Sequence, residues 1–327
     1  MTVSTRSRSA MFARTMAITG ALITALGVVA PAAYAKAPMV KTQAGYYRTM
    51  LGNFEVTVLS DGTNPLPADK LLKGIAPDEL NALLKQQHLT NPVTTSVNEV
   101  LINTGEKLIL IDTGTGGMGP TNGRMLKSLK NAGYSPEQVD EIYITHMHPD
   151  HVGGLSHEGE RVFPNAVVKA SEVEANYWLD EDTMAKAPEG KQRGFAVAME
   201  EMEPYQKAGA FQTFSSGALL SPGITAQAEF GHTPGHETYT IESEGQKLIV
   251  LGDLIHFAAV QFAHPEYAVG FDSDDKEAIA ARKAVFDHAA ENGTLVVGAH
   301  LPFPGLGYIN KSDNGYQWVP INYSLAE

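Results

Sequence analysis

The chain has 327 residues, about twice the length of an ordinary domain, although single α/β domains of this size exist. Hydrophobic residues make up 43% and charged residues 19%, a globular composition that excludes disordered, collagen-like and coiled-coil proteins. There is no Cys, which excludes disulfides, thiol nucleophiles and Cys-ligated metals, and the formal net charge of -13 predicts no nucleic-acid partner.

Residues 1–35 have the features of a secretory signal peptide. Three arginines precede an uncharged stretch over 15–35 that closes with Ala33-Tyr34-Ala35, the small-x-small pattern of a signal-peptidase site. The alternative is an uncleaved membrane anchor, because the stretch approaches the length that spans a bilayer. Gly and Pro interrupt its apolar run, so we expect cleavage after Ala35, a periplasmic or secreted protein, and no stable membrane anchor after cleavage.

Beyond residue 35, predicted strands and helices alternate. Period-two alternation and apolar runs predict strands at 54–59, 97–103, 107–112, 141–145, 224–230, 237–242, 247–251 and, as the last core strand, 294–298. Helical signals predict helices at 68–90, 122–132, 171–178, 183–209 and 275–292. No low-complexity linker divides the series, so we expect one α/β domain over 36–327, built from two βαβ-like halves.

Several polar residues have expected local roles at the ends of these elements. Ser60-Asp61-Gly62 predicts a turn after the first strand, and Asn122 predicts an N-cap. Ser171 and Glu174 have the spacing of a capping box, and Gly293 follows the last helix. The acidic residues before that helix, Asp272, Asp274 and Asp275, are expected to form its solvated start.

The histidines carry the strongest functional signal. Of 11 His, three lie in the segment THMHPDH, residues 145–151, directly after a predicted buried strand. His146 and His148 project to the same side of an extended segment, and a following turn brings Asp150 and His151 beside them. Imidazole and carboxylate groups are ligands for zinc, manganese or iron(II). A packing role explains such a cluster poorly, so the segment predicts a metal site.

Further potential ligands follow three other predicted strands, each one step past the strand end. They are His232 and His236 in GHTPGH, Asp253 after 247–251, and His300 after 294–298. Each alone is more often an ordinary polar residue at a strand end. In open α/β sheets such ends gather at one edge, where ligands bind, so together with 146–151 they predict one shared site.

This combined pattern resembles the metallo-β-lactamase fold over essentially the whole chain beyond residue 35. The resemblance implies a four-layer αβ/βα sandwich with two divalent metal ions between its sheets, zinc first and manganese, cobalt or iron as alternatives. It implies that one metal is held by His146, His148 and His232, the other by Asp150, His151 and His300, with Asp253 bridging them. His236 and Asp112, in the turn Ile111-Asp112-Thr113-Gly114, are then expected to support the ligand loops.

Subfamily features narrow the resemblance. The bridging Asp253 counts against antibiotic hydrolysis, no additional C-terminal glutathione-binding domain is recognised, and an acidic exported chain does not suit RNA processing. Segments 45–48, 141–155, 231–236, 260–262 and 299–307 are similar to methyl parathion hydrolase and its lactonase relatives, which are exported bacterial enzymes. His256 and Phe271 resemble the aryl-lactone, dihydrocoumarin-type hydrolases of that group, whereas acyl-homoserine lactonases place a Tyr at the step of His256.

We therefore expect a hydrolase that opens lactones or aryl esters by attack of a hydroxide bridging the two metals. Asp150 or His256 would move the proton, with a packed structural role as the alternative for His256. Candidates for an apolar substrate pocket are Trp178, Phe195, Phe271 and Met118, with core packing as the alternative for the aromatic side chains. No Gly-x-Ser-x-Gly elbow supports a serine hydrolase.

Three rival functions remain open at this point. The same centre suits an organophosphate triesterase, and an acyl-homoserine lactonase acting in quorum quenching is a less favoured reading. A non-catalytic scaffold is disfavoured because all seven ligand positions are filled. The expected partner is a small apolar ester or lactone, and the resemblance also makes a homodimer plausible.

Overall fold

The computed structural model describes residues 39–324, so the signal-peptide prediction for residues 1–35 lies outside the described part. The chain divides into two compact units, Met1–Thr42 and Gln43–Glu327. In the first unit the described residues, 39–42, are exposed and form no helix or strand. All the elements below belong to the second unit. Within the described range, no helix combines the length and apolar character needed to cross a membrane.

The first sheet contains strands from the amino-terminal half of the second unit, in the order β1-β2-β3-β4-β5-β8-β9. Its first strands pair antiparallel, whereas β4, β5, β8 and β9 run parallel. Parallel strands need crossover connections, and helices supply them here. The bounds are β1 Tyr46–Leu51, β2 Phe54–Leu66, β3 Val93–Asn103, β4 Leu108–Ile111, β5 Glu141–Tyr143, β8 Val167–Ser171 and β9 Phe211–Phe214.

The second sheet follows in chain order, from β10 to β16. Only β13 and β14 pair in parallel, so these two neighbouring strands have their carboxyl ends at the same edge. The bounds are β10 Leu219–Ser221, β11 Ile224–Ala228, β12 Glu237–Ser243, β13 Gln246–Val250, β14 Leu295–Val297, β15 Leu306–Ser312 and β16 Gly315–Pro320. A separate small hairpin joins β6 Ser156–His157 and β7 Glu160–Arg161.

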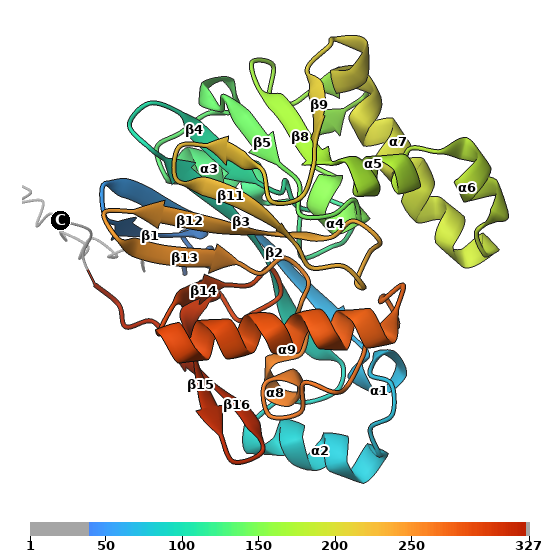
Figure 1. Cartoon of the computed structure of the whole chain (residues 1–327), viewed down its shortest axis with the longest axis vertical. Coiled ribbons are helices and arrows are strands. Elements are labelled where there is room, and N and C mark those ends of the chain that lie inside the picture. Colours follow the sequence, from blue (N-terminus) through green and yellow to red (C-terminus); the bar gives the residue numbers. More distant parts are fainter. Residues whose placement is uncertain (1–38, 325–327) are drawn as a thin grey trace, which may run out of the picture. The chain divides into compact units, whose positions relative to one another are not determined.

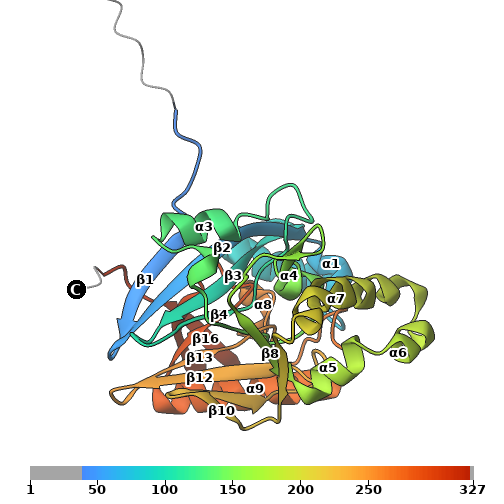
Figure 2. The same cartoon turned by 90° about the horizontal axis from the view of Figure 1, so that it is seen from above.

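Helices cover the outer faces of the two sheets (Figures 1 and 2). An apolar core between the sheets joins residues such as Val56 and Ile109 of the first to Tyr239 and Leu248 of the second. Further clusters lie beneath the helices. The helices are α1 Ala68–Leu71, α2 Pro77–Gln86, α3 Met125–Asn131, η1 Pro136–Gln138, α4 Pro149–Val152, α5 Glu172–Trp178, α6 Glu181–Lys186, α7 Glu189–Lys207, α8 Ala258–Gln261 and α9 Asp275–Asn292. This arrangement confirms the predicted four-layer α/β fold.

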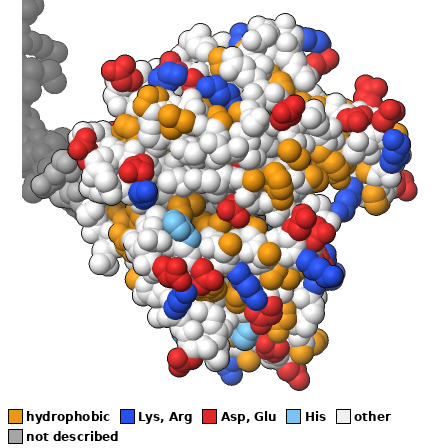
Figure 3. All heavy atoms as spheres, viewed as in Figure 1, with side chains coloured by type: hydrophobic (Ala, Val, Ile, Leu, Met, Phe, Trp, Pro, Cys, Tyr) orange, Lys and Arg blue, Asp and Glu red, His pale blue; other side chains and the backbone are white. Residues whose placement is uncertain are grey.

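The helical insertion is confirmed as α6 and α7, which project beside α5 (Figure 1). Asp180 caps α6 by accepting hydrogen bonds from two backbone N–H groups of its first turn. Charged side chains gather at the outer end of the insertion, at the right of Figure 3. The inner face of α7 is apolar instead, and Phe195 on it is buried. The insertion therefore presents an apolar face to the end of the sheets.

Several local predictions were wrong. The Ser60-Asp61-Gly62 segment is a bulge within β2 rather than a turn, because the Asp61 carboxylate accepts hydrogen bonds from N–H groups of the loop before α3. The 68–90 helix is two helices, α1 and α2. Asn122 caps no helix, since α3 begins three residues later, and its Oδ1 accepts from Gly119 N instead. The strand at 294–298 is followed by the hairpin of β15 and β16.

Candidate metal centre

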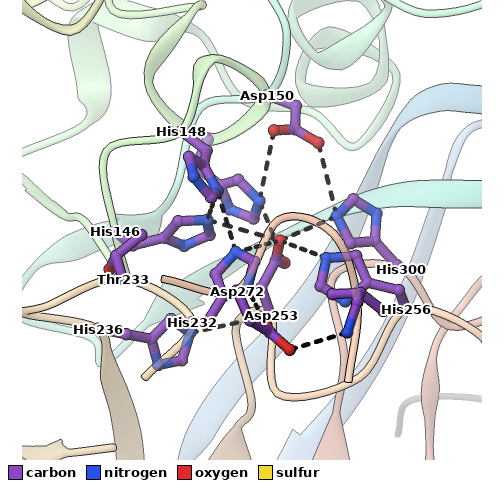
Figure 4. Close-up of polar contacts among 12 residues, drawn as sticks. His146, His148, Asp150, His232, Thr233, His236, Asp253, His256, Asp272 and His300 are labelled. Atoms are coloured by element: carbon purple, nitrogen blue, oxygen red, sulfur yellow. Dashed lines mark hydrogen bonds and ion pairs between the residues drawn. The ribbon is translucent and has the colours of Figure 1, made fainter. Parts of the chain in front are cut away.

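The segment after β5 carries the first four candidate ligands. His148 has an extended backbone and is the N-cap residue of α4, and its Nδ1 lies 3.0 Å from Nε2 of His146. Pro149 begins this helix, where its missing N–H is not needed, and the helical turn redirects Asp150 and His151. The predicted combination of a histidine pair followed by a turn is therefore present (Figure 4).

The second sheet contributes three more candidates at strand ends. His232 lies in the loop between β11 and β12, Asp253 follows β13, and His300 follows β14. Because β13 and β14 are parallel neighbours, Asp253 and His300 emerge at the same edge. The structure thus brings together residues that are more than 150 positions apart in the sequence (Figure 4).

Asp253 lies at the centre of this group. Its Oδ2 is 3.3 Å from Nε2 of His232 and 3.3 Å from Nε2 of His300. Nε2 of His146 is 3.5 Å from the same oxygen, and Nε2 of His151 is 3.2 Å from Oδ1. Both carboxylate oxygens therefore face imidazole nitrogens, which is the geometry of a ligand shared by two cations.

The remaining two candidates, His148 and Asp150, approach different histidines. His148 Nδ1 is 2.9 Å from His232 Nε2, whereas Asp150 Oδ2 is 3.5 Å from His300 Nε2. Within each group the potential ligand atoms lie within 4.8 Å of one another, and the groups are His146, His148, His232 and Asp253; Asp150, His151 and His300; and Asp253, His256 and His300. The first two groups contain all seven predicted ligands.

Polar atoms without partners show that these residues fit bound metal ions. His151 Nε2 and Asp253 Oδ1 are both buried, and neither has a hydrogen-bond partner among the described residues. Buried polar atoms are normally satisfied, so an unpartnered imidazole nitrogen 3.2 Å from an unpartnered carboxylate oxygen fits two ligands of one metal ion. Imidazole nitrogen and carboxylate oxygen together suit zinc and related divalent ions. The donor set therefore fits a dinuclear metal site.

The electrostatics of the site divide its histidines into two groups. Neighbouring carboxylates outweigh burial and raise the pKa of His151, His232 and His300, that of His232 to about 9, so a metal ion would displace a proton from each of these rings. Burial lowers the pKa of His146 and of His148 well below the ordinary histidine value, so both imidazoles are neutral, as metal coordination requires. Burial disfavours a charged Asp253, but the surrounding histidines outweigh that effect and hold its pKa well below the usual range. Asp253 is therefore an anion in a cage of nitrogen ligands.

Asp112 and His236 support the ligand loops by hydrogen bonds to residues of these loops. Asp112 accepts hydrogen bonds from the N and Oγ1 of Thr145, at 2.8 and 2.7 Å, and from Nδ1 of His151 at 2.8 Å. Burial lowers the pKa of His236 to about 3, so its neutral ring accepts from Asp253 N at 3.0 Å and donates from Nδ1 to Glu229 O. Each residue thereby fixes the position of a ligand.

Asp272 corrects the prediction of a solvated acidic helix start. It is buried, and its Oδ1 accepts a hydrogen bond from Nδ1 of His232 at 2.9 Å. Arg282 on α9 is also fully buried, with Nη2 4.0 Å from Asp272 Oδ2 and Nε donating to Leu254 O at 2.5 Å. The roles of these two residues were not predicted, because only the fold brings α9 behind the ligand loops. Asp274 is exposed and Asp275 partly exposed at the helix start, as expected.

A pocket of about 310 Å³ opens beside His148 and His232. Trp178 packs edge-on against His148, with ring centroids 5.2 Å apart, and against Phe195 at 4.5 Å. The predicted pocket residues Trp178, Phe195 and Phe271 all line it, and Tyr177, which sequence reasoning missed, lines it as well. Met118 is 47% exposed and is not among the lining residues. A larger cavity of about 570 Å³ at the amino ends of β13 and β14 contains none of the grouped ligands.

His256 occupies a position between the ligands and the pocket. It is 2% exposed, its Nε2 lies 3.1 Å from Asp253 Oδ2, and its ring stacks on His300 with centroids 4.9 Å apart. Phe271 contacts its other side at 5.7 Å between centroids. The ring is thus turned toward the shared carboxylate, and a part in proton transfer stays a prediction.

Comparison with known proteins gives a family match and several relatives. Residues 93–300, more than half of the chain, match the model of the metallo-beta-lactamase superfamily. An N-acyl homoserine lactonase from Bacillus sp is 26% identical over 151 residues, which is 46% of this chain and 52% of the relative. A Bacillus cereus N-acyl homoserine lactonase is 26% identical over 153 residues, with the same coverage. The chain thus spans about half the length of these curated relatives.

Two solved structures are similar over most of the chain. A hydrolase named AbOPH, in the beta lactamase superfamily, has 39% identity and a TM-score of 0.83, with 87% of this chain and 100% of that chain covered. AidC, a dizinc quorum-quenching lactonase in complex with a product, has 30% identity and a TM-score of 0.79, with coverage of 86% and 99%. The similarity to each of these structures therefore covers a larger share of the chain than the region matched by the family model.

Proposed function

Since the chain belongs to the metallo-beta-lactamase superfamily and is a metal-dependent hydrolase, we propose that it opens lactones or aryl esters. The observation that carries this proposal is the filled set of seven potential ligands beside an aromatic pocket. Similarity to a dizinc lactonase over 86% of the chain supports it. A scaffold protein has no need for buried ligand atoms without partners.

Each ligand has a place in this proposal. His146, His148 and His232 would hold one divalent ion, and Asp150, His151 and His300 would hold the other. Asp253 would be shared between them, since its carboxylate faces His232 of the first group and His151 and His300 of the second. Zinc is the first candidate, since it accepts nitrogen and oxygen ligands, and manganese, cobalt or iron(II) remain alternatives.

Two divalent ions at such a site lower the pKa of water and polarise a carbonyl oxygen. The protein's own side chains would bind and orient the substrate and move a proton. Trp178 and Phe195 offer an apolar wall next to His148, which favours a substrate with an aryl or alkyl group and excludes water. The Asp150 side chain is 28% exposed, whereas five of the other proposed ligands are buried, so it is suited to pass a proton to a leaving alkoxide or phenoxide.

Acyl-homoserine lactones are a second candidate substrate class. The specific support is the likeness to AidC, with 30% identity, and to the N-acyl homoserine lactonases, with 26%. His256 bears on the choice, because an imidazole there faces Asp253, and Phe271 covers it on the pocket side. Phe271 lines the pocket beside the ligands, and we expect its ring to favour a flat aryl lactone over a long acyl chain.

The test compares kcat/KM of the metal-loaded protein on dihydrocoumarin, a long-chain acyl-homoserine lactone and methyl parathion. We expect dihydrocoumarin to lead by at least an order of magnitude. If the acyl-homoserine lactone leads, the lactonase proposal stands and the aryl preference is wrong. A lead for methyl parathion, or no turnover of any substrate with two metals bound, would overturn the lactonase proposal.

A further inference from the structure

Glu174 was predicted as part of a capping box, and in the structure its carboxylate contacts two ligand loops. Ser171 Oγ accepts from Glu174 N at 3.2 Å, which is half of the predicted capping box. The other half is absent, because the Glu174 carboxylate does not return to the N-cap backbone. Its Oε1 accepts from Met147 N at 2.8 Å, and its Oε2 accepts from Thr233 Oγ1 at 2.8 Å and Gly235 N at 2.9 Å.

The partners of this carboxylate identify what it joins. Met147 lies between His146 and His148, and Thr233 follows His232 directly. One buried side chain, 1% exposed, therefore binds both segments that carry the proposed ligands of a single metal. The segments come from different sheets, and the spacing between their histidines depends on how the two loops are held together.

The surroundings leave little room for a substitute. Met147 is fully buried, so its N–H has no access to water if the carboxylate is removed. A Cβ added at Gly235 would lie 2.2 Å from Glu174 N, so only glycine allows this close approach. Ser171 Oγ also donates to Gly235 O at 2.9 Å, which ties the start of α5 to the same loop.

We propose that Glu174 is a positioning residue that sets the spacing between the His146–His148 segment and His232, and thereby the affinity of the first metal position. This inference rests on the ligand assignment in the proposed function. It assigns Glu174 no contact with substrate. Outer contacts of this kind typically change metal affinity by about 10- to 100-fold when they are removed.

The conservative variant Glu174→Gln separates positioning from packing. The Gln oxygen can accept from Met147 N, but its NH2 group then faces Gly235 N–H, so the second loop loses an acceptor. The matched control is Glu201→Gln on α7. Glu201 is also a largely buried carboxylate, and its Oε2 accepts from Ser156 N at 2.7 Å, but it contacts neither ligand loop.

The experiment measures stepwise zinc affinity of the full protein by chelator competition, and the visible spectrum of the cobalt-substituted protein. For Glu174→Gln we expect the affinity for one of the two ions to fall at least 10-fold, with an altered cobalt spectrum and little change for the other ion. Glu201→Gln should match the parent. Affinities within twofold of the parent, or equal losses at both positions, would overturn the proposal.

A second variant and a reading of metal binding without substrate complete the test. If Glu174→Gln fails to fold, Thr233→Val removes one contact while keeping side-chain volume, and a selective loss of about threefold or more is then required. Metal affinity is read without substrate, so the proposed function can fail separately. A parent that binds two metals and hydrolyses no lactone would refute the function, while the selective affinity loss would still support Glu174 as a positioning residue.

Discussion

The buried pair of Asp272 and His232 provides a quantitative test of how the site is supported. Asp272 Oδ1 accepts from His232 Nδ1 at 2.9 Å, and Oδ2 accepts from Val269 N at 2.9 Å. In Asp272→Asn only one of these oxygens remains. If the new NH2 faces His232, the ring must change tautomer, and if it faces Val269, it meets an N–H donor and lies on the side of the Arg282 guanidinium.

Either orientation weakens a supported ligand. Loss of such a contact typically lowers metal affinity about 10- to 100-fold, or about 1.4 to 2.8 kcal/mol. The metal-free protein should also lose stability, by about 1 to 3 kcal/mol, because a buried donor is left without an acceptor. Arg282 limits the loss, since it still donates to the carbonyl oxygens of Leu254, Pro265 and Tyr267.

The assay is chelator competition for zinc, together with thermal unfolding of the metal-free protein. Asp275→Asn is the matched control, because Asp275 is 44% exposed and pairs with Lys73 on the surface. Exposed pairs contribute little, so this variant should bind zinc as the parent does. Zinc affinity of Asp272→Asn within twofold of the parent would refute the supporting role of Asp272.

Three further predictions follow from other parts of the molecule. Burial raises the pKa of Glu201 to about 7, so ionisation of this carboxyl destabilises the fold as the pH rises from the pKa of the unfolded chain toward 7. The Tm of Glu201→Gln relative to the parent should therefore increase from pH 5 to pH 8. A difference in Tm that stays constant over this range would contradict the prediction. Phe195 is buried against Trp178 and lines the pocket, so Phe195→Ala should lower the free energy of unfolding by about 3–5 kcal/mol. It should also raise KM for aryl lactones more than it lowers kcat. An unchanged Tm and an unchanged KM would show that Phe195 contributes neither to stability nor to substrate binding. We also propose cleavage of the signal peptide, so mass spectrometry of exported protein should find Lys36 at the amino terminus, and an intact Met1 would refute cleavage.

The metal-ligand candidates could be predicted because each follows a buried strand. His232, Asp253 and His300 are far apart in the sequence, yet parallel strands and shared sheet edges bring such ends together. The apolar run at 108–111 likewise predicted a fully buried strand, and β4 is buried at every position. Burial patterns on regular elements therefore located several of the strands and the seven candidate ligands, which the structure brings together. The sandwich architecture and the division of the ligands between two metals came from the resemblance, and that division stays a prediction.

The resemblance implied supporting positions for Asp112 and His236, and both contact ligand loops. The roles of Asp272 and Glu174 could not be predicted, since they depend on packing between distant segments. Asp272 sits near Asp274 and Asp275 and has the same local signature, but only Asp272 is covered by the His232 loop and α9. Glu174 likewise satisfies a capping pattern while its carboxylate serves other loops. In contrast, the β15–β16 hairpin had a usable signal, because Asn314-Gly315 is a strong hairpin-turn dipeptide.

The central claim is that lactone opening requires two metal ions held by His146, His148, Asp150, His151, His232, Asp253 and His300. The most direct measurement titrates zinc into metal-free protein while following the ring opening of dihydrocoumarin. We predict that turnover appears with bound zinc, reaches its maximum at two ions per chain, and disappears with a chelator. Turnover that persists without metal, or that is absent with two ions bound, would contradict the claim.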